Sequence, residues 1–392
     1  MTPSRRIVWW GLAGFALILT AGSACGQATD PRLGKVLADW EKRQQAVDSI
    51  RYVVKGQHVI PKGSLRDDTG APLKTPAPAE DVTAEVNWLA VFDFPKGRHR
   101  LEVSEQVFDR KSNRFHPQMG IFVSNGKGAK SAMPRDRNTS EGFTPPPSHI
   151  DLVVSSGNMR GVPFQSEYMP LFFAHGLIRT MAEEVVPGKL RGKPDPEYLS
   201  FHGQGVHAGR PCIVIRTQTL QLANTSFDEF WTDPARDSAI VRYVMYSGKN
   251  IFNNIDIQYQ QTPHGWLPER WTFTHYSGTV PTVIYRMRVE SWQAAPPTSD
   301  ADFDLPVKPG MIVEERVYDD TVNPLVAPKS ATRVYRYGES GGKSEIPDPL
   351  GRPRDLGGKT PWWYWAVGGA LAVAVIAASF WLVRKRIKAV HQ

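Results

Sequence analysis

An uncharged apolar run near the C-terminus constrains this chain more than any other feature. Residues 362–383 contain no Asp, Glu, Lys or Arg. As a helix they would reach about 33 Å, enough to cross a hydrocarbon core of about 30 Å. They are therefore predicted to form one transmembrane helix. Aromatic rings stand near both of its ends, as they do at the two membrane interfaces: Trp362, Trp363, Tyr364, Trp365 and Trp381.

Basic residues after this run set its predicted orientation. The short tail, residues 384–392, begins with Arg384, Lys385 and Arg386. Short flanking segments rich in Lys and Arg stay in the cytoplasm. We therefore expect a single-pass membrane protein with a cytoplasmic tail and everything before the helix outside the cytoplasm.

Residues 1–28 have the pattern of a secretory signal peptide. Arg5 and Arg6 precede an apolar stretch, and small residues follow it. Lipidation at Cys25, a twin-arginine address and retention of the segment as a second span stay open as alternatives. In each case residues 29–361 are expected to lie outside the cytoplasm.

The positive net charge does not indicate a nucleic-acid partner. The chain has 47 Lys and Arg residues against 39 Asp and Glu residues, a formal charge of +8. Most of the surplus lies at the two ends, in Arg5, Arg6 and the tail 384–392. The outer domain is close to neutral, and it carries no basic patch of the kind that binds nucleic acid.

The outer domain is predicted to begin with a helix. Asp30 suits the N-cap and Pro31 the first helical position, and apolar residues then recur at helical spacing to about Ala46. A strand is expected at residues 50–59. An exposed loop rich in Pro, Lys, Asp and Ala is expected at residues 61–81.

Alternating apolar and polar residues predict antiparallel strands after this loop. The even positions from Ala84 to Phe94 are apolar, a period of two that is typical of a half-buried strand. A turn at residues 95–97 leads into a second strand at 98–105. Asn125-Gly126 marks another tight hairpin.

The second half is expected to be mainly strands. Residues 133–161 are polar and rich in proline, which predicts a long surface loop. A second helix is expected from about Pro170 to Val185. The glycine-rich segment 203–209 is predicted to be a hairpin turn. Turn clusters separate short apolar runs, which favours an antiparallel meander: residues 199–202, 212–217, 240–246, 255–260, 271–276 and 283–289. A short strand pair is expected around Val313 and Tyr335.

The order of these elements resembles the lipoprotein-carrier (LolA-like) superfamily. The resemblance covers most of residues 30–290. It rests on a first helix with a tryptophan, a strand, a long hairpin and an Asn-Gly hairpin, with further loose similarity to large envelope relatives in three segments: Phe230-Trp231-Thr232-Asp233-Pro234, Ile240-Val241-Arg242-Tyr243 and Trp266-Leu267-Pro268.

This resemblance implies a curved antiparallel sheet, a half-open barrel, whose apolar concave face binds acyl chains. The predicted fold class is therefore α+β, mainly β, with two or so packing helices and one C-terminal transmembrane helix. The outer domain spans residues 29–337, and a flexible linker rich in Gly, Pro and Ser spans residues 338–361. Unlike the soluble carrier, this chain is predicted to be tethered, and a tethered domain cannot ferry lipid between membranes.

Catalytic motifs are absent from the sequence. It has no Walker loop, nucleophile elbow, His-Glu-x-x-His helix or Cys-x-x-Cys pair. No catalytic, cofactor-binding or metal-binding residue is therefore predicted, and no cofactor. Cys212 lies in an apolar strand pattern, which predicts a buried structural thiol. Two histidine pairs lack a carboxylate at ligand spacing: His202 with His207, and His99 with His116.

The aromatic residues of the long hairpin are the candidate apolar ligand face. Trp88, Phe92 and Phe94 share one side of the predicted strand and suit either a ligand groove or the core beneath a sheet. The first hypothesis is a membrane-anchored, non-enzymatic binding module for acyl chains or lipoproteins. Two alternatives stay open: a structural or sensory protein that contacts another envelope protein through the loops at 61–81 and 133–161, and a hydrolase whose residues converge from distant strands.

Overall fold

The computed structural model describes eight stretches of the chain, which hold all the elements discussed below. They are residues 30–63, 78–109, 114–132, 152–156, 166–178, 196–217, 226–318 and 330–346. The predicted signal peptide, transmembrane helix and tail lie outside these stretches. Among the helices that the structure describes, none has the length and apolar character needed to cross a membrane.

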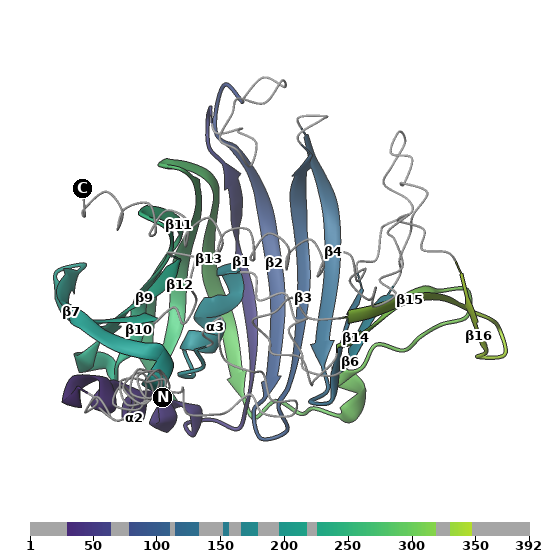
Figure 1. Cartoon of the computed structure of the whole chain (residues 1–392), viewed down its shortest axis with the longest axis horizontal. Helices are drawn as coiled ribbons and strands as arrows, with labels where there is room; N and C mark the ends of the chain where they lie inside the picture. Colours follow the sequence, from purple (N-terminus) through teal and green to yellow (C-terminus); the bar gives the residue numbers. More distant parts are fainter. Residues whose placement is uncertain are drawn as a thin grey trace, which may run out of the picture.

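One open sheet contains every described strand (Figure 1). Its order is β16-β15-β14-β6-β5-β4-β3-β2-β1-β13-β12-β11-β10-β9-β8-β7. The strands are β1 (Ser49–Ile60), β2 (Val82–Asp93), β3 (Arg98–Asp109), β4 (Arg114–Ser124), β5 (Gly128–Ala132), β6 (Leu152–Ser156), β7 (Leu199–His207), β8 (Arg210–Thr217), β9 (Phe227–Asp233), β10 (Ala239–Ser247), β11 (Asn250–Thr262), β12 (Gly265–Ser277), β13 (Val280–Ala294), β14 (Ile312–Tyr318), β15 (Ser330–Tyr337) and β16 (Lys343–Glu345).

The sheet confirms the antiparallel, mainly β architecture expected from the sequence. It is curved and does not close into a barrel: β7 and β16 are its two edges (Figure 1). β1 lies near the middle and joins the two halves of the chain, because it pairs with β2 on one side and with β13 on the other. Each of the expected strands is present, most of them longer than predicted.

The helix α2 (Pro31–Gln44) begins as the sequence predicts. The Asp30 side chain accepts a hydrogen bond from the backbone N–H of Arg32, and Pro31 occupies the first turn. One apolar stripe, Leu33, Val36, Leu37 and Trp40, is buried. The Trp40 indole Nε1 donates to the backbone oxygen of Ser238, 2.8 Å away, which fixes the helix against the start of β10.

The second helix is much shorter than predicted. The helix α3 (Met169–Phe173) has five residues and follows the 3-10 turn η1 (Ser166–Tyr168). The helical pattern continues in the sequence, but the chain turns at Gly176, whose φ is +65°. An added Cβ on Gly176 would lie 2.4 Å from the backbone oxygen of Trp40, so contact with α2 ends the helix here. The rest of the expected helix, from residue 179, lies outside the described stretches.

Three smaller differences concern segments expected to be loops or turns. The surface loop expected at 133–161 contains β6, which pairs with β5 and runs parallel to β14. Within the glycine-rich segment, residues 203–207 belong to β7, and only Ala208 and Gly209 form the turn. The expected linker begins at residue 338, yet β16 lies at Lys343–Glu345. The described elements also include the 3-10 turns η2 (Pro196–Tyr198), η3 (Pro234–Arg236) and η4 (Asp300–Phe303).

Two hydrophobic clusters stabilise the sheet. The main cluster lies on the side that α2 and α3 cover, which we call the inner face; the opposite side is the outer face. A smaller cluster of Val123, Leu152, Leu305 and Val313 lies under β4, β6 and β14. Figure 1 shows α3 in front of β12, β13 and β1, and α2 below β7 and β10.

Candidate apolar binding face

The three predicted face residues lie together on the inner face. Trp88 and Phe92 are four residues apart in β2, so their side chains point to the same side of the sheet. Phe94 follows directly after the strand. Each has an exposed fraction of 2%. The rings of Phe92 and Phe94 stack with their centroids 5.6 Å apart, and Trp88 lies 6.1 Å from the ring of Trp271 on β12. The inner face is therefore a continuous apolar, aromatic surface.

A short segment of the chain itself covers this surface. The ring of Phe172 in α3 meets Phe92 edge-on with centroids 5.0 Å apart. Tyr168 in η1 meets Trp88 in the same way, at 4.5 Å. The predicted ligand face is thus occupied by the segment 166–178, which we call the cover segment.

Polar side chains hold the C-terminal end of the cover segment. Arg43 in α2 is buried, and its Nη2 donates to the backbone oxygens of Ala174 at 2.6 Å and Trp266 at 2.8 Å. The Gln44 amide donates to the backbone oxygen of Gly176 at 3.1 Å. Burial lowers the pKa of Arg43 from its ordinary value. These bonds compensate the buried guanidinium, which would be costly without partners.

A hydrogen bond on the inner face also reaches the cover segment. The Tyr52 hydroxyl on β1 and Nε2 of His175 are 2.8 Å apart. Both groups are buried, and burial raises the pKa of Tyr52 well above its ordinary value. The Tyr52 hydroxyl therefore stays neutral at physiological pH.

Two carboxyl groups lie near the other end of the cover segment. Burial raises the pKa of Glu167 in η1 to about 7, with a further rise from the nearby Glu105 on β3. Burial also raises the pKa of Glu105, which accepts a hydrogen bond from the Tyr285 hydroxyl at 3.3 Å. The Tyr285 ring in turn stacks on His58, with centroids 4.5 Å apart.

The indole N–H of Trp88 is a buried donor on the inner face. The indole Nε1 of Trp88 is buried and makes no hydrogen bond to any described residue. A buried N–H without an acceptor costs about 1 to 3 kcal/mol.

Sequence reasoning found the aromatic residues and missed the polar ones. Period two along β2 identifies Trp88 and Phe92 directly. Arg43 and Glu167 carry no local signal, because their partners lie far away in the sequence. In the stretches that the structure describes, no three His, Cys, Asp or Glu residues gather as metal ligands would. Cys212 is buried, as predicted.

Comparison with known proteins gives structural likeness only. No family model and no curated protein matches the sequence. A Vibrio parahaemolyticus domain, described as an outer membrane lipoprotein-sorting protein, is 10% identical with a TM-score of 0.39, over 68% of this chain and 95% of that one. A DUF1329 family protein from Desulfovibrio piger is also 10% identical with a TM-score of 0.39, over 70% and 98%.

A third solved structure comes from the LolA superfamily. This protein of Nitrosomonas europaea is 8% identical with a TM-score of 0.36, over 69% of this chain and 97% of that one. The chain resembles LolA-superfamily structures. All three TM-scores are below 0.5. What the chain binds has to be inferred from its own residues.

Proposed function

We propose that the protein is a non-enzymatic binding module whose inner face accepts an acyl chain, either free or as part of a lipoprotein. The observation that carries this proposal is the aromatic inner face of an open sheet, covered at Trp88 and Phe92 by one short segment. A ligand reaches these rings when the cover segment moves aside. The chain would do so outside the cytoplasm, tethered through residues 362–383, as its sequence predicts.

The cover segment is a weak competitor for an acyl chain. A five-residue helix is too short to be stable alone, so α3 depends on its contacts with the sheet and α2. Burial of an acyl chain contributes about 0.8 kcal/mol for each CH₂ group. About ten methylenes would therefore offer roughly 8 kcal/mol to offset the displaced contacts of Phe172 and Tyr168.

The unpartnered indole N–H adds a polar preference to the apolar face. A carboxylate or ester oxygen within reach of Trp88 Nε1 would accept its hydrogen bond and remove the cost of leaving it unmade. This favours a ligand with an oxygen-bearing end over a plain hydrocarbon.

Photolabelling of the full chain tests the proposal. A fatty acid with a diazirine on its acyl chain is added to the protein in neutral detergent, irradiated, and located by peptide mass spectrometry. We expect labels on the inner face of β2, around Trp88 and Phe92, and on Phe172. Unlabelled fatty acid should compete for these positions.

The Arg43→Ala variant sharpens this test. Loss of the bonds to Ala174 and Trp266 should release the cover segment and raise labelling of β2 several-fold. Lys42→Ala is the matched control, because this neighbouring cation is exposed and makes no described bond to the cover segment. Labels confined to the outer face or to residues 362–383, in the wild type and in Arg43→Ala, would refute an acyl site on the inner face.

A further inference from the structure

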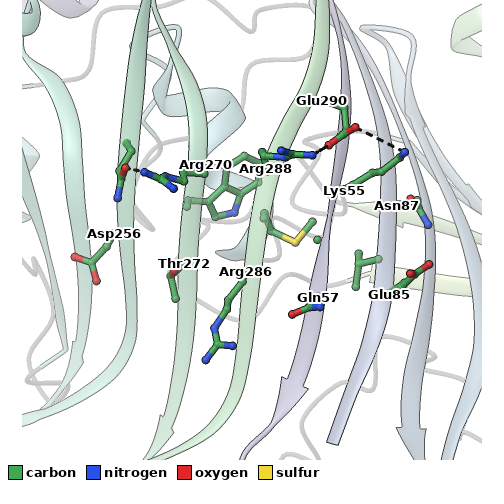
Figure 2. A pocket seen from close by; sticks show the side chains of 15 residues that line it. Lys55, Gln57, Glu85, Asn87, Asp256, Arg270, Thr272, Arg286, Arg288 and Glu290 are labelled. Atoms are coloured by element: carbon green, nitrogen blue, oxygen red, sulfur yellow. Dashed lines mark hydrogen bonds and ion pairs between the residues drawn. The ribbon is translucent and has the colours of Figure 1, made fainter.

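The outer face has a groove of its own, on the opposite side of the sheet from the acyl site. It has a volume of about 800 Å³ and is lined by residues of β1, β2, β11, β12 and β13. Figure 2 shows the polar side chains that line it, pointing away from the core. Four of them are cations, Lys55, Arg270, Arg286 and Arg288.

Strand register places three of these cations in one row. Lys55 on β1 lies directly opposite Arg288 on β13, and Arg288 lies directly opposite Arg270 on β12. Residues opposite each other on neighbouring strands have Cβ atoms about 5 Å apart, and like charges there are destabilising. Arg286 is two residues from Arg288 on the same side of β13, about 7 Å along the strand. The register thus gathers four cations on the outer face of three neighbouring strands.

Acidic residues pair with only two of these four cations. Glu290 pairs with Arg288 and lies 3.7 Å from Lys55. Arg270 donates to the neutral Gln258 amide oxygen at 2.8 Å. Within the described part of the chain, the Arg270 and Arg286 side chains have no carboxylate at ion-pair distance, and the Arg286 guanidinium makes no side-chain hydrogen bond.

The other two carboxylates lie at the flanks of the groove. Glu85 on β2 and Asp256 on β11 stand on opposite sides of Arg286 in Figure 2. Asp256 is already engaged, with His207 Nε2 at 3.6 Å and Arg242 Nε at 3.7 Å. The four cations of the lining therefore outnumber its three carboxylates.

We propose that this groove binds a phosphate group. Three guanidinium groups offer planar sets of N–H donors that match the oxygens of a phosphate, and the lysine adds a further point charge. The cations are accessible: the side chains of Lys55 and Arg288 are 58% and 67% exposed. A bound phosphate would relieve the repulsion within the row, and the flanking amides and carboxylates can bind hydroxyl or ammonium groups next to it.

The phosphate could belong to a soluble compound or to a lipid headgroup, and titration calorimetry of the full chain in neutral detergent separates the two. One arm uses inorganic phosphate and the soluble diester glycerophosphoglycerol. The second compares mixed micelles of the detergent with phosphatidylglycerol or with zwitterionic phosphatidylcholine. Low ionic strength is required, because salt screens exposed charges.

Arg286→Ala/Arg288→Ala should weaken binding about tenfold or more, since hydrogen bonds to charged groups contribute about 1.5 to 3 kcal/mol. Arg51→Ala is the matched control: Arg51 is exposed on the same side of β1 but does not line the groove. If the double variant has a lower melting temperature, the single variant Arg286→Ala replaces it in the titration, because loss of Arg286 breaks no ion pair.

Each outcome of the titrations either supports or overturns the phosphate site. Binding of the soluble phosphates that only the groove variants weaken supports a soluble ligand. Binding confined to phosphatidylglycerol micelles, and weakened by the same variants, supports a lipid headgroup. No binding in either arm, or an equal loss in Arg51→Ala, overturns the proposal. The acyl site lies on the other face, so its photolabelling result is independent of this one.

Discussion

At the scale of single residues, Glu167 links the cover segment to pH. Its pKa is raised by burial from 4.5 to about 7, so the folded state holds a proton that the unfolded chain has already released. The contribution of the protonated Glu167 carboxyl to the free energy of unfolding is fully present below about pH 4.5. It is lost as the pH rises through about 7. One pKa unit corresponds to about 1.4 kcal/mol, so the pH-dependent contribution of Glu167 to stability is at most about 3 kcal/mol.

We expect Glu167→Gln to remove this part of the pH dependence. Urea unfolding between pH 4 and 8 should show a stability advantage of the variant that grows as the pH rises. Glu105 and Tyr285 face the same carboxyl, so both stay unchanged in the comparison. Glu80→Gln, at an exposed position, is the control. Parallel curves for wild type and Glu167→Gln would contradict the expected proton uptake.

Two glycines should respond to alanine with opposite signs. Gly176 has a φ of +65°, and an added Cβ would lie 2.4 Å from the Trp40 backbone oxygen. Gly34 lies inside α2, is exposed, and has open space around an added Cβ. Gly176→Ala should therefore lower the free energy of unfolding by more than about 1 kcal/mol, and Gly34→Ala should raise it by about 0.5 to 1 kcal/mol. Chemical denaturation measures both, and similar values for the two variants would exclude this explanation of the turn.

At the scale of elements, sequence patterns predict a helix or strand correctly where its structure depends on residues close to it in the chain. β2 was predictable because period two appears whenever one side of a strand is buried. The length of α3 was not, because the contact of Gly176 with Trp40 joins residues far apart in the chain. β6 was hidden in a proline-rich segment, and only its neighbours β5 and β14 make it a strand.

The dependence of β6 on its neighbours leads to a prediction. Leu152 is 1% exposed and belongs to the small cluster with Val123, Leu305 and Val313. Leu152→Ala should destabilise this cluster by about 2 to 5 kcal/mol. Hydrogen exchange should speed up in β5, β6 and β14, while β1, β2 and β13 stay protected. Val153→Ala, at a partly exposed position, should change exchange little. Uniform acceleration across the sheet would show that the two clusters unfold together.

At the scale of the whole molecule, the sequence predicts the strands but not their order. The pairing of neighbouring strands such as β2 and β3 can be predicted from the short turn that joins them. The pairing of β1 with β13 and the parallel contact of β6 with β14 have no local signature. The candidate site divides in the same way: its aromatic residues follow from alternation, whereas the contacts of Arg43 with Ala174 and Trp266 join residues far apart in the chain.

The central position of β1 also matters while the protein is being made. β1 ends at Ile60 and its partner β13 ends at Ala294. At about 5 to 20 residues per second, synthesis would take roughly 10 to 50 s to supply that partner. During this time one side of β1 has no partner strand and can pair with other chains. Until residue 294 has been added, newly made chains therefore expose an unpaired strand edge at which another chain can add a strand.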